Sequence, residues 1–122
     1  MFSLISSHKY YLHAGATDMR KSFDSLCGLI QCNVGRSPIG GEVYIFINRY
    51  RNRIKLLHWE YGGFVLYYKR LESGTLELPD VDEKTKSVQV SWSTLVMMVE
   101  GISLEKSKKR RRYFINNLTL DS

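Results

Sequence analysis

Cysteine is scarce in this chain of 122 residues, and long apolar runs are absent from it. Its two cysteines, Cys27 and Cys32, are too few for the disulfide framework of a small secreted domain, which favours a reducing compartment. No window approaches the roughly 18 consecutive apolar residues of a membrane-spanning helix, and the start of the chain lacks the basic region of a signal peptide. We therefore expect a soluble intracellular protein with no membrane partner.

The sequence also lacks the motifs that mark common catalytic and cofactor sites. It contains no G-x-S-x-G nucleophile elbow, no Gly-rich phosphate loop and no C-x-x-C or H-x-x-x-H pair. Asp18 and Asp24 stand six residues apart, too far round a helix to form a tight carboxylate pair. Metal-ligand types are present but poorly spaced: His8, His13, His58, Cys27 and Cys32. We therefore expect a protein without enzymatic activity, with no catalytic residues, no metal site and no cofactor.

The composition is that of a folded domain. Hydrophobic residues make up 43% of the chain and charged residues 25%, which excludes a wholly disordered chain, a collagen-like fibre and a coiled coil. The length suits one domain. We predict a single domain over residues 1–105, followed by a basic C-terminal tail over residues 106–122.

Positive charge is unevenly distributed along the chain. Residues 1–105 hold 12 Lys or Arg against 11 Asp or Glu, whereas residues 106–112 read KSKKRRR and contain no acid. Within the domain, six basic residues in 49–70 are opposed by Glu60 alone, and acidic residues gather in 72–83. This distribution favours a polyanionic partner that the tail contacts as an arm.

Periodicity and capping residues predict the first elements. A short strand over residues 9–13 precedes a helix that we expect to begin at Thr17 or Asp18, since either side chain could cap its free amides. Helical spacing predicts that the buried face of this helix is formed by Met19, Phe23, Leu26, Cys27 and Ile30. The helix should end near residues 33–35, where Gly35 allows a left-handed backbone.

Three β-rich runs, residues 43–47, 54–59 and 64–69, predict an antiparallel meander. Apolar residues occupy both faces of each run, so the sheet is either covered twice or has one face at an interface. Short strands are expected at Thr75–Leu78 and Ser87–Val90, before a helix that Ser91 caps and Gly101 ends. The predicted fold class is α+β: a small domain with an antiparallel β-meander, one helix after the first strand and a second near the C-terminus.

One constellation combines basic and aromatic residues. Arg49, Arg51 and Arg53 surround Tyr50 at the tip of a predicted hairpin, and the meander returns Lys69-Arg70 toward that tip. This surface could hold phosphates while a ring stacks on a base or sugar, or its charges could merely solvate a turn. The other large aromatic residues are expected in the core: Tyr44, Phe46, Trp59, Tyr67, Tyr68 and Trp92.

The order and spacing of several motifs resemble the Orf2-like accessory proteins (TnpB) of the IS66 family of bacterial insertion sequences. Residues 17–24 read TDMRKSFD and residues 63–74 read GFVLYYKRLESG, which are the two most specific matches. Residues 41–49, 53–60 and 97–102 match weaker family segments. The resemblance covers about residues 8–104 and leaves the tail outside.

The resemblance implies an accessory factor in transposition, acting beside a separate transposase that carries the cutting and joining chemistry. The implied partners are DNA of the insertion-sequence ends, the transposase and other element-encoded proteins. Whether the chain also forms an oligomer is left open by the resemblance. The implied location is the bacterial cytoplasm, and the nucleoid when the protein is bound. No catalytic residues come with the resemblance, but Arg20, Lys21, Lys69 and Arg70 fall on recurring motif positions.

Three hypotheses for the function follow, of which the first two are compatible. A nucleic-acid-binding module would hold element DNA, whereas an adaptor would dock the transposase through apolar sheet surface. A metal-dependent nuclease acting through Asp18 or Asp24 is the least favoured. The candidate nucleic-acid-binding residues are Arg20, Lys21, Arg49, Arg51, Arg53, Lys55, Lys69 and Arg70, with Lys108, Lys109, Arg110, Arg111 and Arg112 in the tail.

Overall fold

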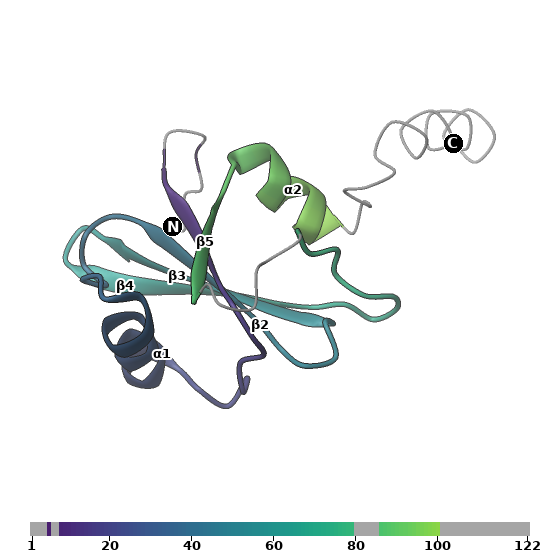
Figure 1. Cartoon of the computed structure of the whole chain (residues 1–122), viewed down its shortest axis with the longest axis horizontal. Helices are drawn as coiled ribbons and strands as arrows, with labels where there is room; N and C mark the ends of the chain where they lie inside the picture. Colours follow the sequence, from purple (N-terminus) through teal and green to yellow (C-terminus); the bar gives the residue numbers. More distant parts are fainter. Residues whose placement is uncertain (1–4, 6–7, 80–85, 101–122) are drawn as a thin grey trace.

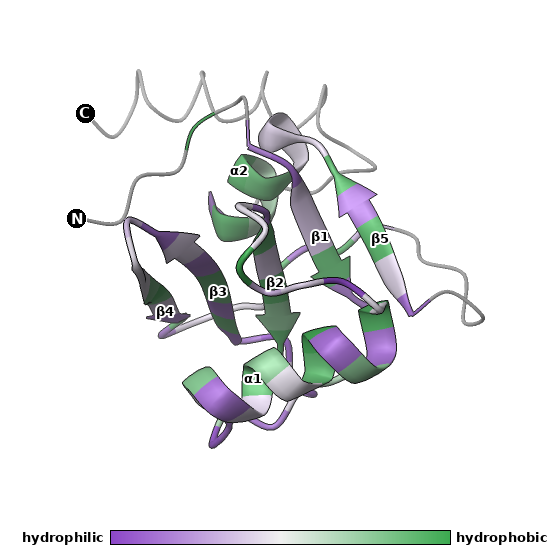
Figure 2. Ribbon diagram, turned by 90° about the vertical axis from the view of Figure 1, so that its left-hand side faces the viewer, coloured by the Kyte–Doolittle hydropathy of each residue, from purple (hydrophilic) through white to green (hydrophobic). Residues whose placement is uncertain are grey.

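A five-stranded sheet in the order β4-β3-β2-β1-β5 forms the centre of the molecule, and Figure 2 shows its strands side by side. The structure is a computed structural model that describes residue 5, residues 8–79 and residues 86–100. The strands are β1 (Tyr10–His13), β2 (Val43–Ile47), β3 (Arg53–Glu60), β4 (Gly63–Arg70) and β5 (Ser87–Val90). The helices are α1 (Phe23–Leu29), continued by the π-helix η1 (Ile30–Val34), and α2 (Trp92–Glu100).

The predicted meander is confirmed, because β2, β3 and β4 pair antiparallel in sequence order. β1 pairs parallel with β2, and β5 pairs antiparallel with β1, so the sheet as a whole is mixed. The predicted strand Ser87–Val90 is confirmed as β5. The prediction of a strand at Thr75–Leu78 is wrong, since this segment is a loop. Leu76 is buried there, and its N–H donates to the Arg51 carbonyl at 2.6 Å.

Both faces of the sheet are covered, as Figure 1 shows with α1 on one side and α2 on the other. The core on the α2 face includes Ile45, Ile54, Leu56, Leu95 and Met98. The core on the α1 face includes Leu26, Ile30, Tyr44, Phe46 and Leu57. Double coverage explains why apolar residues occupy both faces of the central strands. None of the helices in the described part of the chain has the length and hydropathy of a membrane span.

The first helix begins later than predicted. Its N-cap is Ser22, so the predicted start at Thr17 or Asp18 is wrong. The Thr17 N–H instead donates to the Ile47 carbonyl at the end of β2 (2.8 Å), and the Asp18 carboxylate accepts the Arg20 N–H (2.9 Å). Phe23 is exposed, although Leu26 and Ile30 are buried as predicted. The end near Gly35 is confirmed, since this residue follows η1 with a φ of 69°.

The second helix has the predicted N-cap. The Ser91 hydroxyl accepts the Thr94 N–H at 3.1 Å, which satisfies one of the free amides of α2. The predicted end at Gly101 lies outside the described residues. The prediction that Tyr68 lies in the core is wrong, because 47% of its surface is exposed near the end of β4.

The β3–β4 hairpin supplies a stability prediction. It turns through Tyr61 and Gly62, whose φ angles of 49° and 86° match a type I′ turn, which prefers Asn-Gly. The Tyr61 side chain is fully exposed and makes a left-handed backbone costly. We expect Tyr61→Asn to raise the free energy of unfolding by up to about 1 kcal/mol in urea titrations. Tyr61→Ala is the control, and equal stability of the two variants would contradict this account.

Candidate nucleic-acid interface

Most of the predicted nucleic-acid-binding residues that the structure describes lie at one end of the sheet. Because β1 and β2 are parallel, the loop after β1 runs beside the end of β2, where Thr17 bonds to Ile47. β3 begins at this end and β4 finishes there, with Arg53 paired opposite Arg70. We call this surface the basic end and define it by Arg20, Lys21, Arg49, Arg51, Arg53, Arg70 and Lys86.

Lys86 was not predicted from the sequence. It is exposed, and its carbonyl accepts the Ala14 N–H at 3.0 Å, just after β1 ends and just before β5 begins. The antiparallel pairing of His13 with Ser87 therefore brings Lys86 to the basic end. Residue periodicity predicts β5 as a strand but carries no signal of which strand it joins.

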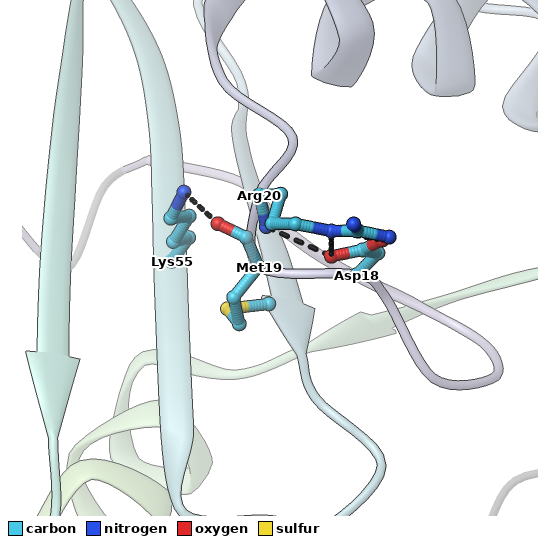
Figure 3. A network of polar contacts seen from close by, with 4 residues as sticks. All are labelled: Asp18, Met19, Arg20 and Lys55. Atoms are coloured by element: carbon cyan, nitrogen blue, oxygen red, sulfur yellow. Dashed lines mark hydrogen bonds and ion pairs between the residues drawn. The ribbon is translucent and has the colours of Figure 1, made fainter.

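Residues 17–22 form a hydrogen-bonded loop at the basic end. The Asp18 carbonyl accepts the Lys21 N–H at 3.1 Å, as in a tight turn that favours Asp in its first position. The Asp18 carboxylate binds the Arg20 guanidinium at 2.7 Å, as Figure 3 shows. The hydrogen bonds from Arg20, together with its charge, lower the pKa of Asp18 to about 2.

Lys55 on β3 fixes this loop to the sheet. Only 5% of Lys55 is exposed, and its Nζ donates to the carbonyls of Met19 and Lys21 at 2.7 Å each. Figure 3 shows the bond to Met19. The same Nζ lies 4.7 Å from the centroid of the Tyr68 ring. Because the ammonium is buried among protein groups, we leave Lys55 out of the basic end despite its selection from the sequence.

The remaining candidates differ in what they contact. Lys69 lies on the α2 face, where its Nζ donates to the Val99 carbonyl (3.2 Å) in the last turn of α2. Arg70 is paired with Glu72 at 2.9 Å. Arg49 and Arg51 are exposed, and neither forms an ion pair with any residue that the structure describes. The tail candidates from Lys108 to Arg112 lie outside the described residues.

The described residues contain no group of three or more His, Cys, Asp or Glu that could hold a metal ion. Two of the possible metal ligands noted in the sequence, His8 and His58, lie close together, with their ring centroids 4.7 Å apart. Burial, and then the charge of His58, lower the pKa of His8. This pair belongs to the end of β3 opposite the basic end, because Val43 at the start of β2 pairs with His58.

The bonds of Lys55 predict a stability effect. Lys55→Met removes the donor from two backbone carbonyls, which should lower the free energy of unfolding by about 1–3 kcal/mol. Arg51→Met makes the same charge change at an exposed position and should cost much less. Urea titrations compare the two variants, and amide hydrogen exchange at Met19–Lys21 should speed up only in Lys55→Met. Equal losses in both variants would show that Lys55 does not hold the loop.

The Asp18–Arg20 pair predicts a pH dependence. Because the folded pKa of Asp18 lies below its ordinary value of 3.8, the pair stabilises the fold above about pH 4 and loses this effect as pH falls toward 2. An NMR titration should place the Asp18 midpoint near 2. Arg20→Gln should move that midpoint up toward 3.8. A midpoint that Arg20→Gln leaves in place would contradict the pairing.

Comparison with known proteins identifies the family. The family model described as IS66 Orf2 like protein matches residues 8–109. The uncharacterized protein y4jC of Sinorhizobium fredii is 25% identical over 93 residues, which cover 76% of this chain and 78% of the relative. The uncharacterized protein y4hO of the same organism is 27% identical over 94 residues, which cover 77% and 80%. No solved structure matches the chain significantly. Since the matched region spans most of the sequence, the chain belongs to the IS66 Orf2-like family of insertion-sequence accessory proteins.

Proposed function

We propose that this accessory protein supports transposition without catalysis, by binding DNA of its insertion sequence at the basic end. The observation that carries the proposal is the convergence of basic residues at one end of the sheet. They come from the loop after β1, the β2–β3 turn, the ends of β3 and β4 that pair there, and the residue just before β5. Guanidinium groups suit this task because they bind phosphate oxygens in a bidentate manner.

The charges of the basic end are available to a polyanion. Arg49 and Arg51 are exposed and free of ion pairs within the described residues. Arg20 and Arg70 are paired with Asp18 and Glu72, but those pairs are solvent-exposed. Exposed pairs contribute little stability, so phosphates could replace either carboxylate at small cost.

The basic tail supplements this surface in the proposal. Val99, one residue before the last described residue of α2, accepts a hydrogen bond from Lys69, which is next to Arg70 in β4. The six residues that follow Glu100, the last of which is Lys106, span at most about 21 Å. We propose that the run Lys106–Arg112 contacts DNA held at the basic end, where each neutralised phosphate adds salt-sensitive affinity.

A second candidate function is a transposase adaptor, and the edge position of β4 favours it. β4 pairs with β3 on one side only in the described sheet, so its outer edge offers unpaired backbone groups to a strand of the transposase. Backbone pairing of this kind depends little on salt. Salt dependence therefore separates the adaptor from DNA binding.

The test measures binding of the full chain to duplex DNA by fluorescence anisotropy, between about 50 and 200 mM salt. Replacing Arg49 and Arg51 with Gln should weaken binding and reduce the slope of log K against log salt by about 1.8, since each lost phosphate contact accounts for about 0.9. Replacing Lys9 and Arg36 with Gln makes the same charge change near the opposite end of the sheet and should leave the slope unchanged.

Replacing the five tail residues from Lys108 to Arg112 with Gln should reduce the slope further while binding by the domain persists. If the two double variants weaken binding equally, the basic end is not the DNA surface. If the unmodified chain does not bind DNA at the lowest salt, the adaptor becomes the better account.

A further inference from the structure

Two tyrosine rings stand exposed at the basic end, beside the arginines. Tyr50 is 74% exposed in the β2–β3 turn, and Tyr68 is 47% exposed near the end of β4. Phe64 and Leu66 share the face of Tyr68 on the same strand, and both pack against the core beneath α1. Tyr68 follows them on the same face, and it is more exposed than either of them.

The Tyr68 ring is held in place from two sides. Its cross-strand neighbour Lys55 lies with Nζ 4.7 Å from the ring centroid, and Lys55 is itself fixed by two carbonyls of the loop after β1. The Arg53 guanidinium donates to the Tyr68 hydroxyl at 3.1 Å. A cation against the ring and a donor at its hydroxyl restrict the side-chain rotamers, so the exposed part of the ring is preorganised for contact.

The turn that carries Tyr50 is also held by side-chain hydrogen bonds. The Asn48 side-chain oxygen accepts the N–H groups of Asn52 and Arg53 at 3.0 Å each. The Asn48 amide donates to the Asn52 side-chain oxygen at 2.7 Å, and Arg51 adopts a left-handed φ of 56° to close the turn. This network presents Tyr50 to solvent between two exposed arginines.

We propose that Tyr50 and Tyr68 stack on unpaired bases, so that the basic end prefers single-stranded DNA to duplex DNA. The inference rests on the proposed DNA binding and deepens it. A duplex keeps its base faces stacked on one another and offers phosphates and groove edges to a protein. An unpaired nucleotide offers a base face as well, and surfaces that combine cations with exposed rings bind it through stacking and phosphate contacts together.

The test compares labelled 20-nucleotide oligothymidine with a 20-base-pair duplex in anisotropy titrations at one salt concentration. The unmodified full chain should bind the single strand more tightly. Tyr50→Ala and Tyr68→Ala should each weaken single-strand binding by about 5- to 150-fold, the range measured for lost base stacking, while changing duplex binding by less than about twofold. Tyr50→Phe and Tyr68→Phe keep the ring and should retain most of the affinity.

The fully exposed Tyr61 in the β3–β4 turn provides the control. Tyr61→Asn removes an exposed ring at the other end of the hairpin and should leave both affinities unchanged. A second readout, proton NMR of the bound oligothymidine, does not depend on the packing of Tyr68. Thymine methyl protons should shift upfield on binding, and the shift should be smaller with Tyr50→Ala. Tyr50 is exposed, so this substitution should leave the fold intact.

The outcomes separate this inference from the proposal on which it rests. Equal affinity for the two DNA forms, or ring variants that weaken both forms alike, would overturn base stacking and leave DNA binding in place. Absence of binding to both forms would overturn the proposed function together with this inference.

Discussion

The Lys55 ammonium is the cation on which the arrangement of the basic end depends. Among the residues that the structure describes, it is the one buried lysine or arginine, and a buried charge needs its hydrogen-bonding partners. Lys55 finds two of them in the carbonyls of Met19 and Lys21, and a third neighbour in the Tyr68 ring. One side chain thus joins the loop after β1, the beginning of β3 and the end of β4.

Parallel pairing of β1 with β2 has the next largest effect on the surface. It places the loop of residues 14–22 at the end of the sheet where the β2–β3 turn lies, although the two segments are far apart in sequence. Pairing of β5 with β1 adds Lys86 to the same end. Charges that look scattered along the chain are thereby gathered, while the acidic partners Asp18 and Glu72 keep two of the arginines oriented.

Local patterns predicted the elements well and their environment less well. β-rich runs separated by turn residues located β2, β3 and β4, a short run located β5, and capping chemistry located the start of α2 at Ser91. The start of α1 was missed because Asp18 can cap a helix or close a turn with Arg20, and tertiary contacts of Thr17 decide between them. Lys55 was predicted at the surface because local sequence does not show tertiary contacts. Its carbonyl partners, Met19 and Lys21, come from a loop more than 30 residues earlier.

The position of β1 within the sheet also constrains the order of folding. The β2–β3–β4 meander links neighbours in sequence and needs only short loop closures. β1 must wait for its antiparallel partner β5, which begins at Ser87, so the first strand gains its second neighbour only when most of the chain is available. During synthesis, one edge of β1 therefore stays unpaired until β5 has left the ribosome. The pairing of β1 with β5 thus joins the first strand of the sheet to the last one along the chain.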